Sequence, residues 1–73
     1  MRANKIKQQL AAWAEREFPD ADKILVKPCP LFGRGGLWDV TVEFPEDGII
    51  EIHSFKAEGE QLRFLGVMEI EEA

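Results

Sequence analysis

The chain has 73 residues and a mass of 8.3 kDa, and its 14 acidic and 9 basic side chains give a formal net charge of −5. This length excludes a two-domain enzyme, because domains usually contain about 100 to 200 residues and a core of fewer than about 80 residues is thin. The hydrophobic fraction of 45% and the charged fraction of 32% are typical of a globular chain. We therefore predict one domain over residues 1–73. The single cysteine excludes a disulfide framework and a thiolate metal cage.

The charge is unevenly distributed along the chain. Residues 1–27 carry a net charge of +2, residues 28–38 carry +1, and residues 39–73 carry −8. Nucleic-acid binding draws its affinity largely from Lys and Arg on phosphates, so the acidic half disfavours it. Residues 1–7 are polar and charged, and no apolar run approaches the length of a membrane span. We expect a cytoplasmic protein with no membrane segment.

A helix is predicted from Asn4 to Phe18. Its apolar residues recur at the spacing of one helical stripe, and they are Ile6, Leu10, Trp13, Ala14 and Phe18. Pro19 disfavours helical geometry at the residue before it, so the helix should end at Glu17 or Phe18.

Two strands and a long loop follow the helix. Lys23 to Lys27 is predicted as a short strand closed by Pro28. Residues 28–36 contain two prolines and three glycines and should form a loop. The second strand has strict alternation, with Trp38, Val40, Val42 and Phe44 on one face and Asp39, Thr41 and Glu43 on the other.

Two hairpins are predicted after the second strand. Glu46-Asp47-Gly48 and Ala57-Glu58-Gly59 both fit three-residue loops with a left-handed glycine at the end. A fourth strand should then run from Gln61 to about Ile70, with a bulge or bend at Gly66. The resulting cross-strand partners are Phe44 with Ile50, Val42 with Ile52, Val40 with Ser54, Lys56 with Glu60, Ser54 with Leu62, and Ile52 with Phe64.

These elements predict an α+β domain in which one N-terminal helix packs on a four-stranded antiparallel β-meander, in the order α-β-β-β-β. The predicted core joins the helix to the apolar face of the sheet, where it includes Trp38, Val40, Val42, Phe44, Ile50, Ile52, Leu62 and Phe64. The order of elements resembles the layout of cystatin-like and PepSY-like modules, in which a sheet wraps a helix. The resemblance is one of architecture, and no functional residue is carried over from it. The position of the first strand in the sheet is left open.

The other face of the predicted sheet is the candidate interaction surface. An antiparallel sheet commonly keeps one face in water, so an ordinary solvated face is one interpretation. The other is an interface, because this face mixes apolar and polar side chains. The candidate residues come from the sheet and from the loop, and they are Leu31, Phe32, Arg34, Thr41, Ile49, His53, Phe55, Arg63 and Leu65.

No catalytic, cofactor or metal site is predicted. His53 is the only histidine, and a lone histidine on a sheet lacks the positioned partner that acid-base catalysis needs. Cys29 lies between two prolines, without a second residue to activate it. The glycine-rich loop leads into a strand, whereas a phosphate loop leads into a helix. Glu43 is expected opposite Glu51, but no established metal-ligand spacing accompanies them.

The sequence therefore favours a small non-catalytic protein-interaction domain of unknown biological role. The expected partner is another protein or a second copy of the chain. The alternative is a small anionic-ligand-binding or enzyme accessory module centred on His53, Thr41 and Arg63.

Overall fold

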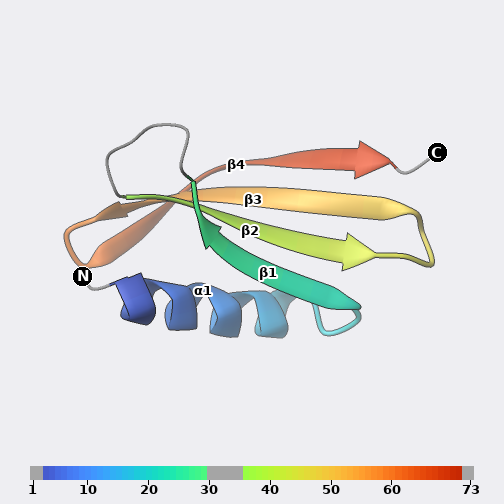
Figure 1. Cartoon of the computed structure of the whole chain (residues 1–73), viewed down its shortest axis with the longest axis horizontal. Helices are drawn as coiled ribbons and strands as arrows, with labels where there is room; N and C mark the ends of the chain where they lie inside the picture. The colour runs from blue at the N-terminus through green and yellow to red at the C-terminus, as the bar shows by residue number, and fades with distance from the viewer. Residues whose placement is uncertain (1–2, 30–35, 72–73) are drawn as a thin grey trace.

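The computed structural model describes residues 3–29 and 36–71. Its elements are α1 (Ala3–Glu17), β1 (Lys23–Pro28), β2 (Leu37–Phe44), β3 (Ile49–Glu58) and β4 (Gln61–Glu71). The strands form one antiparallel sheet in the order β1-β2-β3-β4, and α1 packs mainly against β1 and β2 (Figure 1). The predicted α+β meander is confirmed, and β1 lies at the edge of the sheet beside β2. No helix among the described residues has the length and apolarity needed to cross a membrane.

The helix has the predicted apolar stripe and ends where Pro19 predicts. Ile6, Leu10 and Ala14 are its buried residues. The last helical turn is closed by the Phe18 N–H, which donates to the Ala14 carbonyl across 2.8 Å. Pro19 has no N–H and cannot continue this ladder of hydrogen bonds.

The core lies between α1 and one face of the sheet, which we call the helix face. Trp38, Val40 and Val42 are buried there in one cluster with the buried residues of α1. Phe44 and Leu62 pack at the margin of this cluster. The predicted inward face of the second strand is therefore confirmed.

The β2–β3 hairpin differs from the prediction by one residue. Phe44 pairs with Ile49, and the expected partner Ile50 pairs with Glu43. The loop has four residues because Pro45 joins the turn, in which the Asp47 N–H donates to the Phe44 carbonyl across 3.1 Å. Proline is favoured at the second position of a type I turn because its φ is already set. The left-handed glycine at Gly48 is confirmed, with φ of 65°.

The β3–β4 hairpin also differs from the prediction. Its turn is the two-residue Gly59-Glu60, and Glu58 pairs with Gln61. Gly59 has φ of 60°, which suits a turn with glycine at its first central position. Leu62 therefore pairs with Ala57, where Ser54 was expected.

These two corrections turn over β3 alone. Each register shift is an odd number of residues, and an odd shift moves side chains to the opposite face of a sheet. The prediction that Ile50 and Ile52 belong to the core is wrong, because β3 places Glu51, His53 and Phe55 on the helix face.

A β-bulge interrupts β4 beside Gly66. Phe55 pairs with Phe64, but the preceding residue Ser54 pairs with Gly66, so Leu65 is the additional residue. The predicted irregularity is confirmed, and it changes the alternation of β4. Leu62, Phe64 and Val67 share the helix face, while Met68 and Ile70 lie on the opposite face with Ile52 and Ile50.

Candidate interaction surface

The side of the sheet away from α1, which we call the open face, carries an apolar patch on β3 and β4. Its members are Ile50, Ile52, Leu65, Met68 and Ile70, and we call them the open-face patch. Ile50 pairs with Ile70 and Ile52 pairs with Met68, so the side chains form two adjacent apolar rows. Met68 is 62% exposed, Leu65 47% and Ile70 41%. Large apolar side chains are therefore gathered in water on one half of this face.

The other half of the open face is charged. Lys23 pairs with Glu43 and Lys27 pairs with Asp39 across the β1–β2 ladder, so each lysine lies opposite a carboxylate. The Ser54 hydroxyl donates to Asp39 Oδ1 across 3.0 Å, which links the charged half to β3. The open face thus combines a mainly charged strip on β1 and β2, which also contains Leu25, with the apolar rows of β3 and β4.

The predicted surface residues are divided between the two faces. Thr41, Arg63 and Leu65 lie on the open face, as predicted. His53 and Phe55 are buried on the helix face, and Ile49 pairs with Phe44 on that side. Their predicted exposure on the open face is wrong because the register of β3 is shifted. The loop residues of the prediction lie outside the described part of the chain, and they are Leu31, Phe32 and Arg34.

Sequence reasoning missed four of the five residues in the open-face patch. Ile50 and Ile52 were assigned to the core. Met68 and Ile70 were assigned to neither face of the sheet, because the residues after Gly66 do not keep one alternation. The signal for the last two was present in the bulge. Once one additional residue is allowed beside Gly66, Met68 and Ile70 follow in alternation on the side of Ile52 and Ile50.

His53 is held in the core by a hydrogen bond and by aromatic rings. It is 8% exposed, and its Nε2 donates to Glu51 Oε1 across 2.9 Å. The ring centroids of Trp13 and Phe18 lie 5.5 and 5.0 Å from that of His53. The imidazole is therefore occupied by protein contacts and has little surface to offer a ligand. The predicted pairing of Glu43 with Glu51 is also wrong, because Glu51 is on the helix face with His53.

The three residues of the anionic-ligand alternative do not come together. His53 pairs with Val40 and Val67 on the helix face. Thr41 and Arg63 lie on the open face, and Arg63 Nε contacts Glu58 Oε1 at 2.6 Å. The arrangement that this alternative requires is not formed.

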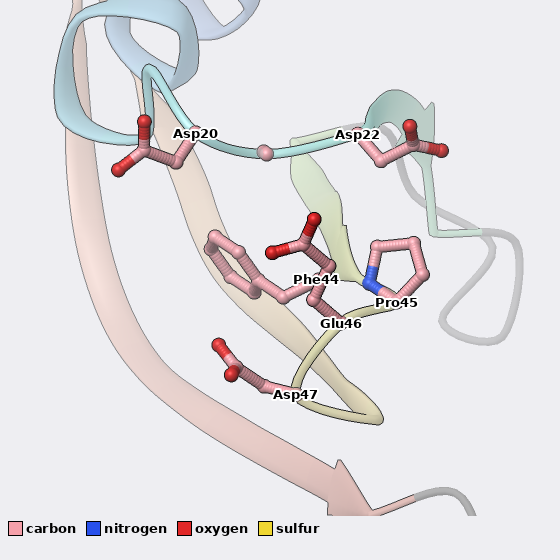
Figure 2. A pocket seen from close by; sticks show the side chains of 7 residues that line it. Asp20, Asp22, Phe44, Pro45, Glu46 and Asp47 are labelled. Carbon is pink, nitrogen blue, oxygen red and sulfur yellow. The ribbon is translucent and has the colours of Figure 1, made fainter.

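An acidic cavity of about 500 Å³ lies between the α1–β1 connection and the β2–β3 turn. Figure 2 shows the carboxylates of Asp20, Glu46 and Asp47 around the ring of Phe44. The carboxylate of Asp22 lies farther out, beyond Pro45. Within residues 3–29 and 36–71, no group of three or more His, Cys, Asp or Glu side chains is arranged to hold a metal ion. The cavity is therefore an open depression lined by acidic side chains at one end of the sheet.

Two hollows flank Leu65 on the open face. One, of about 120 Å³, is lined mostly by apolar atoms and includes Cys29, Leu37 and Trp38. The other, of about 290 Å³, lies over Ser54 and Gly66 next to Met68. Gly66 has no side chain, and an added Cβ would meet nothing within 4 Å, so the bulge leaves this part of the face uncovered. The open face thus has a depression on each side of Leu65.

Comparisons with protein-family models, with curated proteins and with solved structures found no match for this chain.

Proposed function

We propose that this chain is a small protein-interaction domain that binds a partner protein through the open-face patch. The observation that supports the proposal is the pair of apolar rows, Ile50 with Ile70 and Ile52 with Met68, next to the exposed Leu65. Contiguous exposed apolar side chains rimmed by polar residues are typical of protein interaction sites. The non-catalytic character and the cytoplasmic setting are parts of this proposal.

The two halves of the open face have different parts in binding. Burial of the open-face patch would supply most of the affinity, because apolar burial contributes roughly 25 cal/mol per Å². The charged strip beside it, with Lys23, Lys27, Asp39 and Glu43 at register positions on β1 and β2, would fix the orientation of the partner. The hollows beside Leu65 provide places for anchoring side chains.

The test compares two variants of β4 that change opposite faces. Met68→Ser with Ile70→Ser removes two exposed side chains of the open-face patch. Val67→Ser removes a side chain of intermediate exposure (55%, against 62% for Met68 and 41% for Ile70) on the helix face of the same strand and is the control. Each variant and the wild-type chain are used to capture proteins from an extract of the source cells. The captured protein is then titrated into labelled chain, and amide shifts are mapped by NMR.

We expect the wild-type chain and the Val67→Ser variant to retain the same protein and the double variant to lose it. The shifts should fall on Ile52, Leu65 and their neighbours on the open face. Equal capture by the double variant, or shifts confined to the helix face, would contradict the proposal.

A further inference from the structure

The outer edge of β4 is a second exposed feature of the sheet. β4 is the last strand in the order β1-β2-β3-β4 and runs for 11 residues. Figure 1 shows its second half, toward the C-terminus, on the side of the sheet farthest from α1. Among the described strands, only β3 pairs with β4, so the backbone groups along its outer side are available to another strand.

Apolar side chains are exposed on both faces of β4. Phe64 is 52% and Val67 55% exposed on the helix face, beyond the strands against which α1 mainly packs. Leu65, Met68 and Ile70 are exposed on the open face. A partner lying on either face would leave the other group in water. Only a strand beside β4, in the plane of the sheet, contacts both groups at once, because successive side chains of a strand point to opposite faces.

The opposite edge of the sheet is protected. β1 has only six residues, it carries Lys23 and Lys27, and it ends at Pro28, which cannot donate a hydrogen bond. It also packs against α1. The tendency to add a strand is therefore confined to β4.

The charges of β4 favour a second copy of the same strand. Arg63 lies near the start of β4, and Glu69 and Glu71 lie at its end. An antiparallel copy places the Arg63 end of one strand near the acidic end of the other, with Arg63 on the open face and both glutamates on the helix face. With a two-fold axis near Val67, Glu69 of one chain is also kept apart from Glu69 of the other chain. Like charges therefore do not lie directly opposite each other.

We propose that two copies of this chain join edge to edge through antiparallel β4 strands, about a two-fold axis near Val67, to form one continuous eight-stranded sheet. Both copies have the same exposed apolar side chains, so a single isologous contact touches them from the side in both and leaves the open face itself free. This inference goes beyond the proposed function, because the edge of β4 and the open face are different surfaces. The open-face patches of two copies would lie next to each other across the new ladder.

The experiment follows the full chain from low micromolar to millimolar concentration by sedimentation and by amide hydrogen exchange. We expect the mass to rise to about twice 8.3 kDa. Every second amide of β4 should gain protection over the same concentration range, because alternate N–H groups of an edge strand point outward.

Two variants and one control locate the contact. Val67→Lys places two positive charges opposite each other at the axis, and we expect it to weaken the dimer by about tenfold or more. Arg63→Glu should weaken it as well, because it adds a carboxylate beside the acidic end of the neighbouring strand. Leu25→Lys makes the same kind of change at an exposed side chain of β1, on the opposite edge of the sheet, and should leave the dimer intact.

A chain that stays monomeric at millimolar concentration would overturn the inference. So would a dimer in which the β4 amides gain no protection, or one that Val67→Lys leaves unchanged while its circular dichroism matches the wild type. If the double variant Met68→Ser with Ile70→Ser weakens a dimer whose β4 amides gain no protection, that dimer is formed through the open faces of the two copies instead. That result rejects edge pairing and leaves the proposed function standing.

Discussion

His53 is the single buried polar side chain among the described residues, and its contacts explain how the core accepts it. Glu51, two residues away on the same strand, accepts a hydrogen bond from Nε2 of His53. Trp13 and Phe18 pack against the imidazole ring. A buried polar group is stable only with such a partner, because its loss leaves a desolvated atom unpaired. At the scale of the residue, His53 therefore stabilises the fold and leaves binding to other surfaces.

This interpretation predicts that His53→Ala lowers the free energy of unfolding by about 2 to 3 kcal/mol, through the cavity and the lost partner of Glu51. His53→Phe keeps the ring packing and should cost less. Lys56→Ala, at an exposed site on the same strand, should change stability by no more than about 0.5 kcal/mol. Urea denaturation measures all three. An equal effect of His53→Ala and Lys56→Ala would show that the aromatic cluster does not support the core.

Gly59 and Gly66 differ in what a side chain would meet. Gly59 has φ of 60°, and an L-residue there costs about 1 kcal/mol or more. Gly66 does not have a positive φ, and its added Cβ would enter open space. We expect Gly59→Ala to destabilise the chain by about 1 kcal/mol and Gly66→Ala to stabilise it by about 0.5 kcal/mol. Thermal unfolding would contradict this account if the two variants shifted the midpoint in the same direction.

At the scale of the element, α1 packs on the sheet through a residue with a small side chain, Ala14. Ala14 is fully buried, whereas Ala12, half a turn away, is exposed. A small side chain at Ala14 brings the helix close to the strands beneath it.

Ala14→Leu should therefore cost about 1 to 3 kcal/mol of stability through overpacking. Ala12→Leu adds the same atoms on the water side of the same helix and should stay within about 0.5 kcal/mol of the wild type. Chemical denaturation of the two variants provides the comparison. If Ala12→Leu were as destabilising as Ala14→Leu, the distance between helix and sheet would not be the cause.

The elements show why the fold could be predicted from the sequence while the site could not. The stripe of α1 and the alternation of β2 each favour one face, so their orientations followed from pattern alone. β3 contains Ile50 and Ile52 in one alternation and His53 and Phe55 in the other, so its pattern fits either face. The choice depended on Pro45, whose place in the turn adds one residue to the loop. Because the open face is defined by β3, the error in one turn moved three of the predicted surface residues into or toward the core.

At the scale of the whole molecule, α1 covers the sheet unevenly. It packs mainly on β1 and β2, and the fully buried strand residues Val40 and Val42 belong to β2. Every described residue of β4 except Leu62 and Gly66 is exposed. Stability against local opening should therefore fall from the middle of the sheet toward the end of β4.

Hydrogen exchange at low micromolar concentration should detect this gradient. We expect the slowest amides at Val40 and Val42 and the fastest strand amides at Glu69 to Glu71, because few apolar contacts hold that end of β4. Uniform protection across the four strands would show that the sheet opens only as a unit.

Gly36 and Cys29 join the ends of the β1–β2 connection to the sheet by backbone hydrogen bonds. The Cys29 N–H donates to the Leu37 carbonyl across 2.8 Å, and the Ala57 N–H donates to the Gly36 carbonyl across 2.6 Å. Both bonds are made by described residues, so we expect the register of β1 with β2 to survive exchange of the residues between Cys29 and Gly36 for a foreign peptide. The added entropy of closing a longer connection rises only slowly, by about 0.6 kcal/mol for each doubling of length. On this expectation, the chain would serve as a small scaffold for grafting and displaying unrelated sequences.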